Sequence, residues 1–114
     1  MEELNLSDRL RLIAGLIKKG SKVADIGTDH GYLPIFLVKS GITDRVIAMD
    51  VRKGPLKKAE DNTRAFCVFD QIELRLSDGL AALEKGEADT VTISGMGGRL
   101  IQSILTNGME KLDK

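Results

Sequence analysis

The chain has 114 residues, of which 42% are hydrophobic, and its 17 basic residues are balanced by 17 acidic ones. That length suits one folding unit, and the hydrophobic share is too high for a disordered chain. The zero net charge excludes a polybasic arm, and the apolar runs fall far short of the roughly 20 residues that a membrane span needs. Cys67 is the only cysteine, so no internal disulfide can form and a reducing, cytoplasmic setting is expected.

The first half of the chain alternates between helical and strand patterns. Residues 6–19 predict a leading helix, because apolar residues recur at spacings of three and four, Ser7 can cap its start and Gly20 can end it. Residues 23–26 predict a short buried strand. Residues 32–39 predict a helix with Pro34 in its first turn, and residues 45–50 predict a second buried strand.

The second half continues the alternation. Residues 55–66 predict an exposed helix with Leu56, Ala59 and Thr63 on its inner face, and residues 71–76 alternate like a half-exposed strand. Residues 80–85 predict a short helix and residues 89–94 a fourth strand. A last helix is expected to open at residues 100–105 and to end near Asn107-Gly108.

Strands that alternate with helices in this way indicate βαβ units and a parallel sheet. The first two strands are continuously apolar, as central strands are, whereas the third alternates as an edge strand does. We therefore predict an α/β fold of the Rossmann-like type, with about four strands in the order 3-2-1-4 and flanking helices. Ligands in such sheets bind at the carboxyl ends of the strands.

Acidic residues and glycines follow the first two predicted strands. Asp25 lies in a turn with Gly27 and Gly31, where glycine allows a ligand to approach the backbone, although a purely structural turn would use glycine too. Asp50 ends the second strand, where a carboxylate can accept both hydroxyl protons of a ribose. Its alternative role is to cap the helix that follows.

The third and fourth strands are followed by similar residues. Asp78 can accept a hydrogen bond from the exocyclic amine of adenine while Gly79 leaves room for the ring, or Asp78 can cap the next helix. Ser94-Gly95-Met96-Gly97-Gly98 is glycine-rich, which suits close approach of a ligand or a flexible turn.

Taken together, the four strand ends predict a site for a nucleoside-bearing cofactor with little phosphate. Neither a P-loop nor the dinucleotide pattern G-x-G-x-x-G is present. Asp29 in the first turn would repel a pyrophosphate and attract a cation such as a sulfonium.

The run D-I-G-T-D-H-G-Y-L-P at residues 25–34 resembles motif I of the class I S-adenosylmethionine-dependent methyltransferases. More narrowly, it resembles the TrmK type of bacterial tRNA adenine-N1 methyltransferase, which modifies an adenine in the D-arm. The segment at residues 6–16, the pair Asp50-Val51, the run at residues 77–79 and the glycine-rich run at residues 94–98 extend the likeness over most of the chain.

The resemblance implies a role for each matching residue. The methionine part of the cofactor would contact Gly27, Thr28 and Gly31, with Asp25 ordering the loop or reaching the amino group. The ribose would bind Asp50, and the adenine would bind Asp78 and Gly79. His30 would contact the cofactor or hold the loop, and the methyl group and target base would lie near Gly95 and Met96.

The family's sheet has seven strands and a helical C-terminal extension thought to grip tRNA. We therefore interpret residues 1–114 as one N-terminal part of a methyltransferase domain, with a leading helix at 1–20 and cofactor-binding βα units at 21–98. The expected partners are S-adenosylmethionine and, through the full-length protein, tRNA.

Asp29 is the candidate catalytic residue, because it is an acid where ordinary motif I has glycine, and a carboxylate stabilises the cationic product as charge develops. Its alternative role is a contact with the cofactor or a backbone amide. No metal site is expected, since His30 is the only histidine and Cys67 lies far along the chain.

Two alternatives of other classes remain open. One is a dinucleotide-binding module, since Asp50 also suits that cofactor's ribose. The other is a non-catalytic half-domain that associates with itself through the uncovered edge of the fourth strand.

Overall fold

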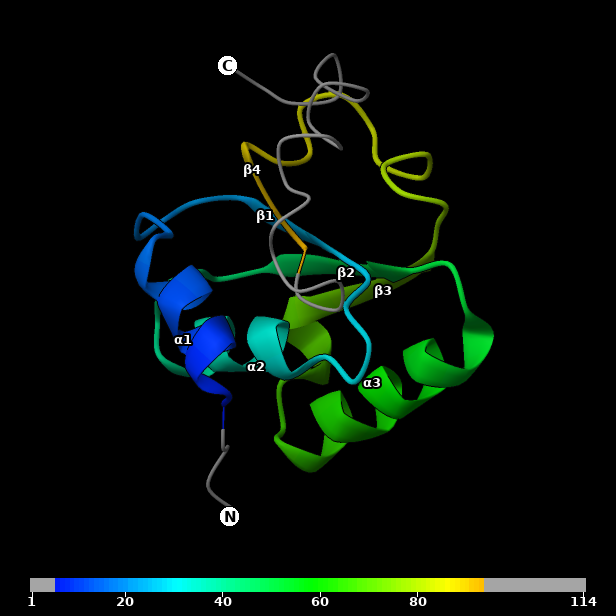
Figure 1. The fold of residues 1–114 in the computed structure, drawn as a ribbon, viewed down its shortest axis with the longest axis horizontal. Helices are drawn as coiled ribbons and strands as arrows, with labels where there is room; N and C mark the ends of the chain where they lie inside the picture. The colour runs from blue at the N-terminus through cyan, green and yellow to red at the C-terminus, as the bar shows by residue number, and fades with distance from the viewer. Residues whose placement is uncertain (1–5, 94–114) are drawn as a thin grey trace.

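A computed structural model describes residues 6–93 of the chain. Its framework is a parallel sheet of β1 (Val23–Ile26), β2 (Val46–Asp50), β3 (Ile72–Leu76) and β4 (Thr90–Ile93). Among the described residues the strand order is β3-β2-β1-β4 (Figure 1). The predicted Rossmann-like α/β fold and the predicted order are therefore confirmed, and β3 lies at an edge as its alternating pattern indicated.

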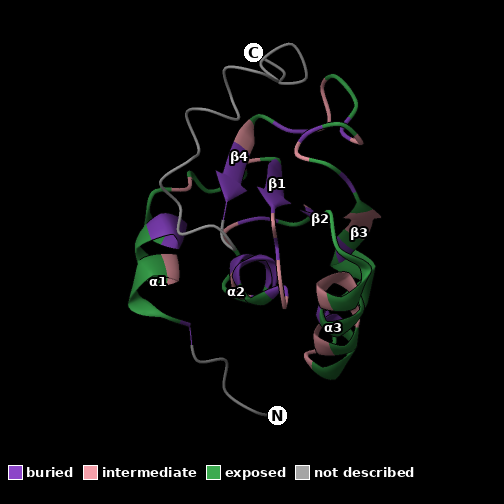
Figure 2. Ribbon diagram, turned by 45° about the vertical axis from the view of Figure 1, so that its right-hand side comes forward, coloured by how far each residue is buried: buried purple, intermediate pink, exposed green. Residues whose placement is uncertain are grey.

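Three helices cover one face of this sheet, namely α1 (Asp8–Gly15), α2 (Tyr32–Lys39) and α3 (Lys53–Ala65), as Figures 1 and 2 show. A 3₁₀ turn, η1 (Phe69–Gln71), leads into β3. The middle helix, α2, is the most deeply buried, since Leu33, Ile35 and Leu37 have no exposed surface. It fills the centre of the helical face and joins a core with residues of α1, β1 and β2.

The opposite face of the sheet carries a second core. Ala24 and Ile26 of β1, Met49 of β2 and Val91 and Ile93 of β4 lie there. They pack against three apolar residues, Leu80, Leu83 and Ala88, from the segment that joins β3 to β4. We call residues 77–89 the crossover segment. It lies on the side of the sheet away from the three helices (Figure 1).

The sequence predicted the type and order of most elements, but α1 ends earlier than expected. Ser7 caps α1 as predicted, its Oγ accepting a hydrogen bond from the amide of Leu10 at 3.3 Å. The helix nevertheless ends at Gly15, before the predicted end at residue 19. Gly20 instead donates its amide to the carbonyl of Ile42 at 2.8 Å, so a tertiary contact takes the chain out of the helix.

Two sequence-based interpretations are wrong. Residues 80–85 form turns and no helix, because side chains bind the backbone groups that a helix would pair internally. Ser77 Oγ accepts from the amide of Ala82 at 3.0 Å, for example. The apolar neighbours of Cys67 in the sequence, Phe66, Val68 and Phe69, predict a buried side chain, but Cys67 is exposed and has a φ of 62° at the turn after α3.

The predicted last helix and the end of the fourth strand at Ser94 lie outside the described residues. Within residues 6–93, no helix is both long enough and apolar enough to cross a membrane.

Candidate functional site

The register of the sheet brings the ends of neighbouring strands to one edge. Ile26, the last residue of β1, pairs with Met49 of β2 and with Ile93, the last residue of β4. Asp50, the last residue of β2, pairs with Leu76, the last residue of β3. Asp25 and Asp50, at the ends of β1 and β2, and Asp78, in the loop after β3, therefore lie along a common rim of the sheet, as the sequence predicted.

The loop after β1 is tied to the end of β2. The amide of Thr28 donates to the carbonyl of Met49 at 2.8 Å, and the amide of Asp29 donates to Asp50 Oδ2 at 3.1 Å. Asp29 adopts the left-handed conformation, with φ of 57°, which Asp tolerates better than most residues. This turn directs the Asp29 amide at the carboxylate of Asp50.

The carboxylate of Asp50 is buried, with 2% exposure. Besides the amide of Asp29 it accepts the amide of Arg52 at 2.9 Å through Oδ1, and the Arg52 side chain lies 3.5 Å away. The cap of α3 is Arg52, without a side-chain hydrogen bond, so Asp50 does not cap that helix through its side chain. Each carboxylate oxygen has two lone pairs, which leaves acceptor capacity for a ligand hydroxyl.

Asp25 is buried completely within β1. Its Oδ1 accepts a hydrogen bond from Thr92 Oγ1 of β4 at 2.7 Å. The side chain thus joins the two strands just below the rim. This position fits a role in ordering the loop, which was one of the two roles expected for Asp25.

The loop from Thr28 to Gly31 packs closely against α3. Gly31 caps α2 with φ of 79°, and a Cβ atom built on it would lie 3.1 Å from the Cβ of Ala59. The carbonyl of His30 accepts from Asn62 Nδ2 of α3 at 2.8 Å. A larger residue at position 31 would push the loop away from α3, so the sequence requires glycine here for close approach as well as for the turn.

Asp29 and His30 turn their side chains towards solvent. Their side chains are 48% and 38% exposed, and Asp29 Oδ2 lies 3.8 Å from His30 Nδ1. Asp29 therefore offers an accessible carboxylate beside the rim. His30 also contacts the ring of Tyr32, with 5.6 Å between the ring centroids.

Asp78 and Gly79 follow β3 at the same rim. The amide of Ser77 donates to the carbonyl of Asp50 at 2.9 Å, which ties the start of the crossover segment to β2. Asp78 is exposed, and Gly79 has φ of 59° with open space where its side chain would be. Gly95 and Met96 lie outside the described residues.

Sequence reasoning missed four residues that hold this rim together. Thr92 binds Asp25, and Asn62 binds the loop at His30. Arg75 and Glu87 form a bidentate ion pair between β3 and the crossover segment. The alternation of Glu73 and Arg75 along β3 placed both on one face, but no local pattern could pair Arg75 with a residue twelve positions later.

The described residues contain no group of three or more His, Cys, Asp or Glu side chains that could hold a metal ion. The described part of the rim offers a ligand carboxylates, backbone amides and small residues.

Comparison with known proteins identifies the family of this chain. A model of the methyltransferase domain matches residues 6–114. The chain belongs to the methyltransferase domain family. The resemblance inferred from residues 25–34 is thus confirmed at the level of the family.

One curated relative and two solved structures extend the comparison. The tRNA (adenine(22)-N(1))-methyltransferase of Bacillus subtilis strain 168 is 43% identical over 112 residues, or 98% of this chain. The crystal structure of the B. subtilis m1A22 tRNA methyltransferase TrmK has a TM-score of 0.86 and 43% identity over 96% of this chain. The structure of M. capricolum TrmK in complex with S-adenosyl-homocysteine has a TM-score of 0.79 and 40% identity over 94% of this chain.

The match covers only part of those proteins. The chain spans 47% of the B. subtilis enzyme in sequence, 47% of its solved chain and 49% of the M. capricolum chain. It therefore spans about half the length of the relatives that it matches.

Proposed function

We propose that this chain binds S-adenosylmethionine and forms the cofactor-binding part, within residues 21–98, of an enzyme that methylates N1 of adenine in tRNA. The observation that carries the proposal is the link between the motif at residues 25–34 and Asp50, made by the Asp29 amide. Relatives with the same fold and at least 40% identity include one in complex with the cofactor product. A tRNA substrate implies a cytoplasmic protein.

The residues at the rim fit this cofactor. Asp50 retains lone pairs for ribose hydroxyls, and Thr28 Oγ1 is buried with no hydrogen-bond partner among the described residues. A buried hydroxyl without a partner is costly, so a polar ligand that satisfies it gains affinity. Gly31 keeps the loop against α3, and the exposed carboxylate of Asp29 favours a cationic ligand.

The chain's residues supply positioning and charge for the reaction. S-adenosylmethionine, when bound, supplies an electrophilic methyl group on a sulfonium. Adenine N1 has a lone pair at neutral pH and needs no base, but it lies on the pairing edge, so the base must leave its stack first. The product is a cation, and the carboxylate of Asp29 would stabilise that charge as it forms.

The cofactor proposal is tested by calorimetric titration of S-adenosylmethionine into the parent chain and an Asp50→Asn variant. We expect binding by the parent and a loss of about ten-fold or more in the variant, because a neutral amide is a weaker acceptor for the ribose. A matched Asp70→Asn variant changes an exposed carboxylate of η1 and should bind as the parent does.

A second titration with NAD addresses the dinucleotide alternative. If the parent chain binds NAD tightly and does not bind S-adenosylmethionine, the chain is a dinucleotide-binding module and the proposal is wrong.

The catalytic role of Asp29 requires the full-length enzyme. Asp29→Ala should abolish methylation of tRNA while S-adenosylmethionine binding stays largely intact. Binding loses only the weak attraction of an exposed carboxylate, and the backbone amide that reaches Asp50 remains. If binding and methylation fall by the same factor, Asp29 serves the cofactor and has no separate catalytic role.

A further inference from the structure

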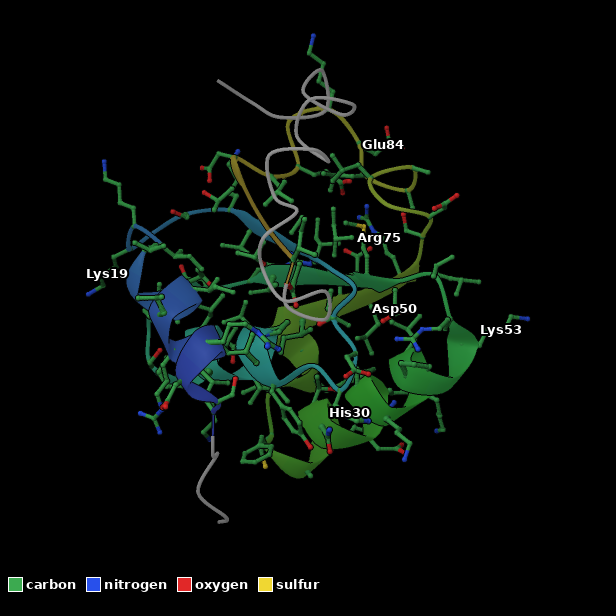
Figure 3. All side chains as sticks on the ribbon, viewed as in Figure 1. Lys19, His30, Asp50, Lys53, Arg75 and Glu84 are labelled. Atoms are coloured by element: carbon green, nitrogen blue, oxygen red, sulfur yellow. The ribbon has the colours of Figure 1, made fainter. Side chains whose placement is uncertain are left out.

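Arg75 occupies an unusual place for an arginine, under the crossover segment. It lies on β3, on the face of the sheet that is away from the three helices, and its side chain is only 18% exposed. Figure 3 shows Arg75 between the sheet and the part of the crossover segment that carries Glu84. A side chain of this length with so little exposure must be held by partners on both sides.

The guanidinium of Arg75 connects β3 to two points of the crossover segment. Nη1 donates to Glu87 Oε1 at 2.7 Å and Nη2 donates to Glu87 Oε2 at 2.5 Å, which is a bidentate pair. Nη1 also donates to the carbonyl of Ala82 at 2.8 Å, and Nε donates to Glu73 Oε2 at 2.7 Å on the same strand. All three nitrogens of the fork are therefore engaged.

Glu87 also holds the backbone of the crossover segment at residue 84. Its Oε1 accepts the amide of Glu84 at 2.6 Å. Arg75 and Glu87 together thus fix backbone groups at residues 82 and 84. These contacts add to the turn hydrogen bonds of the segment, in which the amides of Ala81, Leu83 and Glu87 donate to the carbonyls of Asp78, Leu80 and Glu84.

The restrained segment begins with the residues expected to hold adenine. Asp78 and Gly79 lie between Ser77, which is tied to the carbonyl of Asp50, and Ala82, which is tied to Arg75. The hydroxyl of Ser77 also donates to the carbonyl of Gly79 at 2.9 Å. Asp78 makes no side-chain hydrogen bond to a described residue, so only the backbone on either side of it sets its position.

We propose that Arg75, through Glu87 and the carbonyl of Ala82, is the positioning residue that holds Asp78 and Gly79 in place to recognise the adenine ring of the cofactor. This inference rests on the proposed function. Among the described residues the side chain of Arg75 binds Glu73, Ala82 and Glu87, and none of the residues expected to contact the cofactor. It acts by fixing the C-terminal side of the turn that carries Asp78.

The ion pair persists over the whole physiological pH range. The hydrogen bond from Arg75, followed by the amide of Glu84, lowers the pKa of Glu87 to about 2. The hydrogen bonds to Glu87 and Glu73 raise the pKa of Arg75 further above its ordinary value. A lysine could not replace this arrangement, because one ammonium group cannot form the bidentate pair and also reach Glu73.

The test compares S-adenosylhomocysteine with S-inosylhomocysteine, in which a carbonyl replaces the exocyclic amine of the base. The parent chain should bind the adenosyl compound about ten-fold more tightly, because its amine donates to the carboxylate of Asp78. Asp78→Asn should reduce this preference towards one. Arg75→Gln should reduce it in the same way although it leaves Asp78 in the sequence.

Two further variants separate positioning from general stability. Arg75→Lys should keep part of the preference, because it retains a charge beside Glu87. Arg45→Gln removes an exposed arginine that lies 3.9 Å from Glu73 but does not contact the crossover segment, and it should keep the full preference. Amide hydrogen exchange should quicken at residues 77–89 in Arg75→Gln, while the amides of α2 keep their protection.

The possible results separate cofactor binding, adenine recognition by Asp78 and the positioning role of Arg75. A parent chain that binds neither compound overturns the proposed function. A parent that binds both equally overturns the recognition of adenine by Asp78, and with it the role of Arg75. A preference that is unchanged in Arg75→Gln overturns the positioning role alone.

Discussion

Asp50 has a structural role as well as the expected ligand-binding one. Its buried carboxylate accepts the amides of Asp29 and Arg52, so it connects the loop after β1 to the start of α3. An acid at the end of a strand was read from the sequence as a ribose ligand or a helix cap. The structure shows that it also shapes the loop that would carry the cofactor.

This double role predicts a loss of stability in Asp50→Ala. Removing the carboxylate leaves two backbone amides without their acceptor, and we expect the free energy of unfolding to fall by about 3 kcal/mol. Urea denaturation followed by circular dichroism measures the change. Asp70→Ala, at an exposed position, should change it by less than about 0.5 kcal/mol. Similar losses in both variants would contradict the structural role.

Residue identities along the rim could be predicted from the sequence because they follow strand ends. Asp25, Asp50 and Asp78 each come at or after an apolar run, and parallel strands end at one edge. The partners of these residues could not be predicted in the same way. Thr92 reaches Asp25 across 67 positions of the chain, a pairing set by strand order and register together.

At the scale of elements, the cap of α2 approaches α3 at Gly31. Gly31 has a left-handed backbone, and a Cβ atom added to it would lie 3.1 Å from the Cβ of Ala59. Gly31→Ala should lower the free energy of unfolding by about 2 kcal/mol, from backbone strain and from the crowded contact. Thermal unfolding measures it.

Gly15→Ala is the matched control for that substitution. Gly15 ends α1, and no atom lies within 4 Å of its added Cβ. Alanine is the better helix former, so the variant should be neutral or slightly stabilised. A loss at position 15 equal to that at position 31 would mean that neither the strain nor the contact with Ala59 matters.

The crossover segment shows where sequence patterns fail at this scale. Residues 80–85 have helical composition, but Ser77, Arg75 and Glu87 supply partners for the backbone of the segment. The competing structure depends on a tertiary contact from Arg75 of β3, which the periodicity of residues 80–85 does not encode. By contrast, the pattern at residues 32–39 predicted α2 without error, because a central buried helix is determined by its own apolar residues.

The pair of Arg75 and Glu87 predicts a specific pH dependence. The pKa of Glu87 is lowered from 4.5 to about 2, so its stabilisation is fully present above 4.5 and is lost as the pH falls towards 2. Above this window the free energy of unfolding of the parent should exceed that of Glu87→Gln by on the order of 1 to 2 kcal/mol. This is less than the pKa shift alone would give, because solvent screens the pair. The difference should vanish at the acid end of the window.

Urea denaturation of both proteins across the window measures this difference, in which the titration of other carboxylates cancels. Glu84→Gln serves as control, since Glu84 contributes its backbone amide and no side-chain hydrogen bond. A constant difference between parent and Glu87→Gln at every pH would show that the charge of Glu87 is not involved.

At the scale of the whole molecule, the sheet has two outer strands with different surroundings. β3 is followed along one side by α3 and ends in the half-exposed Leu76. Within residues 6–93, β4 pairs only with β1. Among the described residues β4 is therefore an edge strand, and an uncovered edge favours pairing with another chain.

We therefore expect the chain to associate with itself through β4. Its sedimentation coefficient should rise with protein concentration. The measurement is made with a thiol reductant, because the exposed Cys67 could otherwise form a disulfide between chains. Thr90→Lys places a charge at the start of β4 and should return the chain to a monomer, whereas Leu76→Lys makes the same change on β3 and should not. A parent that stays monomeric at every concentration would contradict the prediction. Dissociation by Leu76→Lys alone would instead place the contact at β3, the outer strand that packs beside α3.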